Sequence, residues 1–544
     1  MRKTCVCLLS AAALFAGCSH SRNAAFEKMR AEMLARERPV VYNTDGCDML
    51  YYPKNLPVTP EGFTSLRLKH TLGTTISTIS YCPLASCFAH FCLLKAGDPF
   101  TNSVEAAGHE NDYNATLAFD RIGHDCLEMA LAFSRTNGFE RFMSIRMNDS
   151  HDCCSVEDLK AKRYPAFFSV FKREHPEYLM CDPLKGEQLA KGIAQWTCVD
   201  FSHEEVRAKV RQFVGQFCEH YDIEGMELDF CRHLLYFRSV AMGGVASDEE
   251  RELMNQLMRD IRAITDKYGR QRGKPILLTA RVPDSVAFCH DIGLDLTQWL
   301  KDRSLDALIG GCYFNFNDLK QTADFVHGYG AKFYASIDES RIPGTAKRLK
   351  LPIIPGRDSK ANYTARFAAA MSAGCDGVYL FNLEFGRLND YLKVDPRETD
   401  GLDKIYFATE RGRGGYEPTH YLVDGYRHMN LPYIDPAARE ELRQRVSAPF
   451  DFNLRIGDDF AKAATKGLKP KVTVMALTDA KTEQDAALSM NGVKLKQAAF
   501  ADGLFTYEAD PAVVKRGLNA FTLSPVEGRQ LMFRDFAVKI EYVR

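Results

Sequence analysis

The sequence predicts a protein of the α/β class: a (β/α)8 TIM barrel followed by a C-terminal β-sandwich domain. From Pro39 onward, short apolar runs alternate with amphipathic stretches, which is the pattern of parallel strands joined by helical crossovers. The last hundred residues instead carry short strands separated by turns, without a long helix. No glycine-rich phosphate turn follows any strand, which argues against a doubly wound open sheet.

Eight apolar runs are predicted to be the barrel strands, and eight such repeats fit a barrel with insertions. They are Val40–Asp45, Thr74–Tyr81, Phe139–Asn148, Gly225–Asp229, Pro275–Arg281, Ala307–Asn315, Lys332–Asp338 and Gly377–Phe381.

Between these strands, apolar residues recur with the 3.6-residue period of a helix in three stretches, and a fourth stretch is rich in alanine. The predicted helices are Arg121–Asn137, Glu204–His220, Asp248–Tyr268 and Ala361–Ala373. We expect the barrel domain to cover residues 39–450, ending in a loop-rich tail with a helix near Pro436–Val446.

The β-sandwich is expected over residues 451–544. It lacks clustered carboxylates and histidines, so we expect an accessory domain that carries no chemistry. Its predicted strands are Val472–Leu477, Ala487–Met490, Phe505–Glu508, Ala520–Leu523 and Phe536–Tyr542.

The N-terminus has the features of a secretory signal peptide. Arg2 and Lys3 precede an apolar run that is too short for a permanent membrane span. The segment Leu14-Phe-Ala-Gly-Cys18 resembles the lipobox of bacterial lipoproteins, which implies cleavage after residue 17 and a lipid on Cys18. Ser19 favours the outer membrane by the same resemblance, and residues 19–38 are expected to be a tether. The expected location is therefore the cell envelope, reached by export.

The amino-acid composition limits the classes of partner that we expect the protein to bind. The chain has 70 basic and 71 acidic residues, which argues against a nucleic-acid partner. Its 17 cysteines contain no tight pairs of the kind found in closed zinc sites. We expect them to be buried small hydrophobic residues with one or two disulfides, and we expect no metal and no cofactor.

The active site of such a barrel lies at the carboxyl ends of its strands, so polar residues there are the candidates. On the fourth strand, Glu227 and Asp229 share the face that points to the barrel axis, opposite Met226 and Leu228. Two carboxylates in a barrel interior need a function or a partner. The alternative is a structural ion pair with an arginine of a neighbouring strand, Arg146 or Arg281.

Other strand ends add carboxylates, amides, arginines and tyrosines. We expect Asp229 to be a catalytic carboxylate, with Asp338, Glu339 or Glu384 as its partner. The residues expected to bind substrate are Asn43, Asp45, Arg146, Asn148, His151, Asp152, Glu227, Arg232, His233, Arg281, Tyr313, Asn315 and Asn382.

The stretch Gly225-Met-Glu-Leu-Asp-Phe-Cys-Arg-His233 resembles the fourth-strand motif of the alpha-amylase superfamily, where the Asp is the nucleophile. It also resembles the corresponding strand of chitinase-like barrels. With the lipobox and the trailing β-domain, the chain resembles an uncharacterised bacterial family of glycoside-hydrolase-like barrel lipoproteins. The chitinase acid falls on Cys231 and the amylase arginine on Glu227, so the resemblance assigns a role to Asp229 alone.

These observations favour a glycoside hydrolase that acts on a poly- or oligosaccharide through two barrel carboxylates. Two alternatives remain open. One is a glycan-binding surface lipoprotein without activity, and the other is a metal-dependent hydrolase that uses His151, Asp152 and Asp229.

The lipobox predicts that Cys18→Ser releases the protein from membranes, because the serine hydroxyl cannot take the thioether-linked lipid. Partition of wild type and variant between a detergent phase and an aqueous phase measures this. Equal partition of the two proteins would contradict lipid attachment at Cys18.

Overall fold

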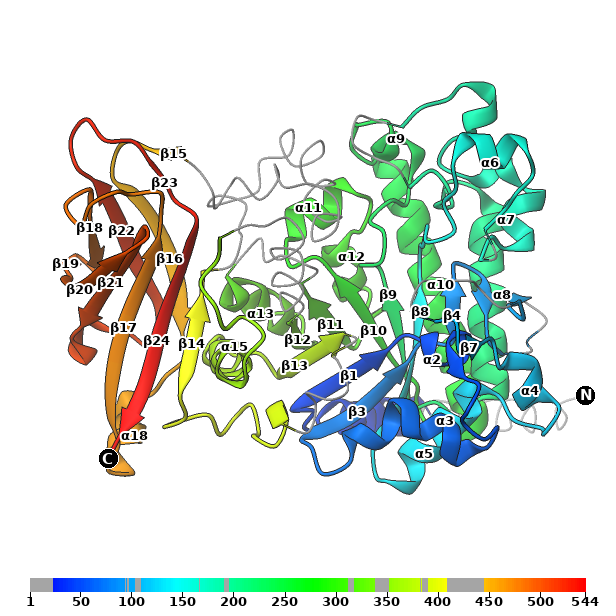
Figure 1. Ribbon diagram of the computed structural model, residues 1–544. Coiled ribbons are helices and arrows are strands. Elements are labelled where there is room, and N and C mark those ends of the chain that lie inside the picture. The colour runs from blue at the N-terminus through cyan, green and yellow to red at the C-terminus, as the bar shows by residue number, and fades with distance from the viewer. Residues whose placement is uncertain are drawn as a thin grey trace, which may run out of the picture.

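The computed structural model describes residues 23–92, 94, 97–102, 109–165, 167–189, 195–311, 318–337, 352–381, 383, 390–408 and 445–544. Its centre is a closed barrel of eight parallel strands in the order β1-β13-β12-β11-β10-β9-β8-β3 (Figure 1). The strands are β1 (Val40–Thr44), β3 (Ile76–Tyr81), β8 (Glu140–Arg146), β9 (Gly225–Asp229), β10 (Leu277–Val282), β11 (Ala307–Gly310), β12 (Lys332–Ser336) and β13 (Gly377–Phe381).

The predicted fold class is confirmed, and each of the eight predicted strands coincides with a barrel strand. Several predicted strands extend beyond the ends of the observed strands. The third strand, for example, stops at Arg146 rather than Asn148, because the chain turns there into the loop of Asp149 and His151.

The helices of the crossovers surround the barrel. Asp248–Arg272 (α10) begins with a capping box between Ser247 and Glu250 and ends at Gly273, whose φ of 70° suits a left-handed cap. The others are α3 (Pro60–Leu66), α5 (Cys126–Thr136), α8 (Glu204–His220), α11 (Val286–Asp291), α12 (Leu296–Lys301), α13 (Leu319–His327) and α15 (Lys360–Ser372).

Helix α5 starts five residues later than predicted. Asp125 caps it by accepting from the backbone N–H of Glu128, and Gly123 just before has a φ of 77°. Ile122, expected on the apolar face of this helix, is 48% exposed.

Short elements fill the long loops between strands. The helices are α2 (Cys47–Leu50), α4 (Thr116–Asp120), α6 (Val156–Lys160), α7 (Val170–Glu174) and α9 (Arg238–Ala241), with 3-10 turns at Leu68–Thr71, Pro176–Tyr178 and Pro183–Lys185. Strand β2 (Tyr52–Pro53) pairs with β7 (Asp112–Tyr113), and a small sheet contains β4 (Leu84–Ser86), β5 (Ala89–His90) and β6 (Asp98–Pro99).

The C-terminal domain is a sandwich of antiparallel sheets. One sheet has the order β14-β24-β17-β21-β20 and the other β16-β22-β18-β19. Its strands are β14 (Lys404–Phe407), β15 (Arg445–Val446), β16 (Phe450–Ile456), β17 (Lys469–Leu477), β18 (Ala486–Met490), β19 (Val493–Lys494), β20 (Lys496–Ala501), β21 (Leu504–Ala509), β22 (Gly517–Pro525), β23 (Leu531–Met532) and β24 (Asp535–Val543), with α18 (Phe460–Thr465) and a 3-10 turn at Pro511–Val513.

Strand β14 precedes the expected start of the sandwich at residue 451, yet it pairs with β24 at the edge of the larger sheet (Figure 1). The expected boundary therefore separates this strand from the sheet that it completes. The predicted helix near Pro436–Val446 lies almost wholly outside the described residues, and Arg445–Val446 form β15.

The β-sandwich is held closely against the barrel through α15. Gly457 lies so near this helix that an added Cβ would meet the carbonyl of Ala368 at 2.1 Å. Arg455 also makes a two-pronged ion pair with Asp318, with N···O distances of 2.7 and 2.6 Å. Figure 1 shows α15 between the barrel strands and β14.

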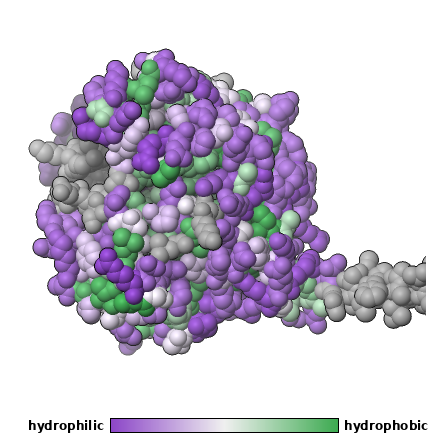
Figure 2. Space-filling model, turned by 90° about the vertical axis from the view of Figure 1, so that its right-hand side faces the viewer, coloured by the Kyte–Doolittle hydropathy of each residue, from purple (hydrophilic) through white to green (hydrophobic). Residues whose placement is uncertain are grey.

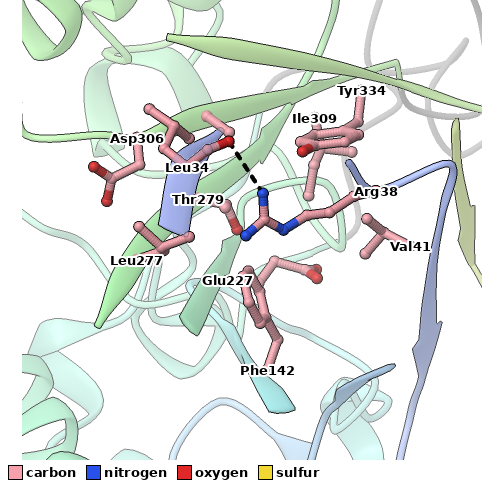
Figure 3. Close-up of a pocket in the computed structure, with 11 residues that line it drawn as sticks. Leu34, Arg38, Val41, Phe142, Glu227, Leu277, Thr279, Asp306, Ile309 and Tyr334 are labelled. Carbon is pink, nitrogen blue, oxygen red and sulfur yellow. Dashed lines mark hydrogen bonds between the residues drawn. The ribbon is translucent and has the colours of Figure 1, made fainter. Parts of the chain in front are cut away.

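The segment expected to be a tether is ordered from residue 23 and closes the amino end of the barrel. Residues 23–34 are helical, and Met33 packs with Phe142 and Leu277. Arg38 then enters the barrel, where its guanidinium binds both oxygens of Glu140 at 2.5 and 2.9 Å. Figure 3 shows Arg38 in a small cavity that Glu227 also lines. The expected tether is thus wrong for this part, because these side chains fill the barrel end.

The cysteines follow the expectation of buried hydrophobic residues, but the expected disulfides do not occur among the described ones. None of the 13 described cysteines forms a disulfide, and most are buried. The sulfurs of Cys92 and Cys126 lie 4.0 Å apart, too far for a disulfide.

The molecular face turned away from the β-sandwich is mostly hydrophilic, with small separate hydrophobic areas (Figure 2). No helix in the described part of the chain has the length and apolar character needed to cross a bilayer.

Arg38→Met should destabilise the barrel by about 3 kcal/mol, because it leaves the mostly buried Glu140 with only the more exposed Arg36, at 3.3 Å, as a cation. Urea unfolding measures this. In the matched control Lys320→Met, which removes an exposed ion pair with Asp324, the loss should stay below about 1 kcal/mol. Equal losses in the two variants would contradict a structural role for Arg38.

Candidate active site

The floor of the site is the carboxyl group of Glu227, at the middle of β9. It accepts hydrogen bonds from Ser80 at 2.6 Å, Tyr379 at 2.8 Å, Ser144 at 3.0 Å and Asn43 at 3.1 Å. These donors come from four other strands, so the side chain points to the barrel axis as predicted. Ser144 of β8 points to the barrel axis by the same contact.

Glu227 is buried, and this has an electrostatic consequence. Burial raises the pKa of its carboxyl group, and the nearby Asp229 raises it further, to about 7, against the opposing effect of the hydrogen bonds and Arg281. The four donors around it are all uncharged. Glu227 therefore exchanges its proton near neutral pH.

Asp229 ends the same strand, one pleat period nearer the carboxyl end of the barrel. It is 1% exposed, and both of its oxygens lie 3.4 Å from Nη1 of Arg281 on β10. The backbone N–H of Cys231 donates to Oδ1 at 2.9 Å. Of the two arginines expected to face Asp229, Arg281 is thus the one that pairs with it.

The other arginine, Arg146, belongs to a second group of linked ion pairs. Its Nη1 donates to Asp149 at 2.9 Å, and its Nη2 lies 3.7 Å from Asp45. Asp45 in turn accepts from Arg67 at 2.7 Å. Burial acts to raise the pKa of Asp45, but Arg67 and Arg146 outweigh it and lower that pKa. These ion pairs link Arg67, Asp45, Arg146 and Asp149, in that order, along the carboxyl ends of β1 and β8.

Asp149 also holds His151. Its Oδ1 lies 2.6 Å from Nδ1 of His151 and accepts from the His151 backbone at 2.8 Å. His233 is close by, and its Nδ1 accepts from the backbone of Ser150 at 3.1 Å. Burial lowers the pKa of His233 to about 3, so its ring is neutral at neutral pH.

Asp149, His151 and His233 are near enough to one another to be considered as a metal site. Their surroundings disfavour a cation, because Arg146 is bound to Asp149 and Arg232 lies 3.4 Å from His151. The described residues do not bring together the three ligands that the metal-dependent alternative needs. A second group combines Cys92, which follows β5, with Asp125 and Cys126 at the start of α5. It comes from none of the strand ends that carry the predicted site.

Asn148 and Asp152, two of the predicted substrate-binding residues, make their hydrogen bonds within the protein. The amide of Asn148 donates to the carbonyls of Val199 and Leu235 and accepts from the backbone of Val199 and Asp149. Asp152 is buried between Lys172 and Thr197, each at 2.7 Å. Both side chains position loops, and their hydrogen-bonding groups are not free for a ligand.

Arg232 lies beyond Asp229 in the loop after β9. Its guanidinium covers the ring of Phe381 at 4.8 Å, and Arg281 approaches the same ring at 4.4 Å. Arg232, His151, Arg281 and Asp229 therefore gather at one end of the barrel, where the sequence placed them.

Several predicted residues lie outside the described part of the chain and stay predictions. They are the three candidates for the second carboxylate, Asp338, Glu339 and Glu384, the substrate-binding Tyr313, Asn315 and Asn382, and the lipidated Cys18.

Sequence reasoning missed four residues that the structure adds to the site: Ser80, Tyr379, Arg67 and Asp149. Ser80 and Tyr379 could have been found, because strand alternation puts them on the inward face beside Asn43 and Phe381. Arg67 could not, since it comes from the region of α3, far from any strand end.

No family model matches the chain, and no curated protein matches it in sequence. Among solved structures, an alpha-galactosidase of family GH36 from Geobacillus stearothermophilus aligns at a TM-score of 0.32 and 10% identity, with 93% of this chain covered. The chain spans 56% of the length of that galactosidase.

Two further similar structures align over more of their own length. An alpha-amylase from Geobacillus thermoleovorans, complexed with acarbose, has a TM-score of 0.36 and 10% identity, with 90% of this chain and 98% of the amylase covered. A family 18 N-acetylglucosaminidase from Paenibacillus barengoltzii has a TM-score of 0.34 and 10% identity, covering 65% and 99% respectively.

The pKa of Glu227 predicts a specific pH dependence of stability. The unfolded side chain loses its proton near 4.5 and the folded one near 7, so the folded state binds more protons between these values. The stabilisation that Glu227 provides is complete below 4.5 and is lost as the pH rises through 7. A shift of this size corresponds to about 3 kcal/mol.

Glu227→Gln removes this titration and leaves the other groups in place. The free energy of unfolding of wild type relative to this variant should therefore fall by about 3 kcal/mol between about pH 4.5 and about pH 8. Urea unfolding at both pH values measures the difference. A difference that is independent of pH would show that Glu227 does not titrate in this range.

Proposed function

We propose that the chain is a glycoside hydrolase, with Asp229 as one of its catalytic carboxylates. The observation that supports this most directly is the position of Asp229 at the carboxyl end of β9, facing Arg281 above a floor of hydrogen-bonded side chains. In barrels of this type the carboxyl ends of the strands form the active site. A carboxylate paired with a guanidinium there is suited to act as nucleophile or to stabilise a cationic transition state.

Cleavage of a glycosidic bond requires a second carboxyl group on the other side of the bond. The candidates remain Asp338, Glu339 and Glu384, which follow β12 and β13 in the sequence. Glu227 is not suited to this role, because its two oxygens accept from four internal donors. A separation of about 5 Å from Asp229 would indicate retention of configuration, and about 6.5–9.5 Å would indicate inversion.

The setting that we propose for this activity is the bacterial cell envelope. The lipobox supports attachment through a lipid on Cys18, and residues 23–38, which follow it in the sequence, bind at the amino end of the barrel. The anchor would therefore approach from the amino ends of the strands and leave the carboxyl ends open to a polysaccharide.

The described side chains at the strand ends support contact with a polar ligand. Asp45, Arg146, His151, Arg232 and Arg281 offer charged donors and acceptors of the kind that bind sugar hydroxyls. A glycan-binding protein without activity would use the same residues, so turnover is the property that separates the two functions.

Asp229→Asn keeps the shape of the side chain and removes its charge. Turnover on whichever glycan proves active should fall at least about a hundredfold, while the melting temperature changes little. Release of reducing ends and thermal unfolding should be measured on the same preparation. Turnover near that of wild type in a folded variant would remove Asp229 from the mechanism.

Asp376→Asn is the matched control. Asp376 also pairs with a cation, Lys332 at 2.7 Å, but it precedes β13 at the opposite end of the barrel. This variant should keep its turnover even if it loses stability. A collapse of stability in Asp229→Asn, larger than in Asp376→Asn, would instead favour a purely structural ion pair with Arg281.

A further inference from the structure

Arg232 differs from the other arginines at the carboxyl end of the barrel, because it has no carboxylate partner among the described residues. Arg67 pairs with Asp45, Arg146 with Asp149, and Arg281 with Asp229. Asp45 is near enough for Arg232 to lower its pKa, but its close contacts are with Arg67 at 2.7 Å and Arg146 at 3.7 Å. Among the residues that the structure describes, one positive charge at this end thus has no paired carboxylate.

The hydrogen-bonding groups of Arg232 are also incompletely used. Its Nε is buried and has no hydrogen-bond partner in the described part of the protein. Its Nη2 has one neighbour, Nε2 of His151, at 3.4 Å. A buried donor without an acceptor is costly, so such an atom in a site calls for a ligand that supplies the acceptor.

The guanidinium is held in place rather than loose. Its carbon lies 4.8 Å from the centre of the Phe381 ring, while that of Arg281 lies 4.4 Å from the same ring. His151 is fixed in turn by Asp149 at 2.6 Å. Since Phe381 ends β13 and Arg281 contacts Asp229, the unpaired charge belongs to the same site as Asp229.

We propose that the site binds an anionic glycan, with Arg232 holding a carboxylate or sulfate group of the sugar next to the bond that is cleaved. This rests on the proposed function and adds the substrate class to it. A guanidinium presents two parallel N–H donors through Nε and one Nη, which match the two oxygens of such a group. The ligand would supply the missing acceptor for Nε and the missing negative charge together.

Binding of matched charged and neutral oligosaccharides tests this. The carboxylate pair is an oligogalacturonate and its methyl ester, and the sulfate pair is a sulfated dextran oligosaccharide and plain dextran. Wild type should bind the charged member of one pair at least about tenfold more tightly than the neutral one. The preferred pair identifies the carboxylate or the sulfate. Calorimetry gives the dissociation constants, and reducing-end release is recorded separately.

Arg232→Gln should lose this preference, so that its dissociation constant for the charged ligand rises about tenfold or more while that for the neutral one stays unchanged. Arg232→Lys keeps the charge but loses the two parallel N–H donors. Its preference for the charged ligand should lie between those of wild type and Arg232→Gln. Arg238→Gln is the matched control, since Arg238 is six residues further on and forms an exposed pair with Glu187. It should bind like wild type.

Equal binding of charged and neutral ligands by wild type would overturn the proposal, as would an unchanged preference in Arg232→Gln or no binding of any charged ligand. The failure of the hydrolase proposal gives a different result, namely charge-selective binding without release of reducing ends. Hydrolysis without charge preference would support the hydrolase proposal and contradict the proposal of an anionic substrate.

Discussion

A single buried carboxyl group, that of Glu227, constrains most of the barrel interior. A carboxyl group removed from water needs hydrogen-bond donors for its oxygens, and in a closed barrel these can come only from the inward faces of other strands. Ser80, Ser144, Tyr379 and Asn43 supply them from β3, β8, β13 and β1. The register of four strands is thus tied to one residue of a fifth.

This constraint divides the interior. An apolar group inside the barrel contains Val41, Ala307, Ile309, Tyr334, Tyr379 and Phe381. Tyr379 joins it to the polar cluster, because its hydroxyl donates to Glu227. Below Glu227, Arg38 and the helix of residues 23–34 close the amino end. Above it stand Asp229 and Arg281. The polar floor therefore separates a sealed structural end from an end whose charges face the site.

Alternation along strands predicted the features that depend on one strand at a time. It placed Glu227, Asp229, Ser144 and Arg281 inward, and the structure agrees. It could not choose the partner of Asp229, because Arg146 on β8 and Arg281 on β10 are both level with it in the sheet. The choice is decided outside the strands, by Asp149 in the following loop, which binds Arg146.

The segments that the sequence predicts least well are those whose structure depends on contacts with residues far away in the chain. Residues 19–38 are polar enough to suggest a tether, but Arg30 and Arg38 find Asp266 and Glu140, which are far away in the sequence. Likewise β14 has no local feature that assigns it to the sandwich rather than to the barrel. Its place is set by pairing with β24 at the far end of the chain.

Arg38 and Arg232, at opposite ends of the barrel, differ in how their donors are satisfied, and this contrast bears on function. At the amino end, Arg38 directs its donors at Glu140 and at the backbone carbonyls of Met33, Leu34 and Arg36. At the carboxyl end, the buried Nε of Arg232 has no acceptor among the described residues. Folding alone would favour satisfying both, since an unsatisfied buried donor costs about 1–3 kcal/mol. The unsatisfied donor of Arg232 lies beside the Phe381 ring that Arg281, the partner of Asp229, also contacts. An anion bound there would offset this cost at the place where we propose the chemistry.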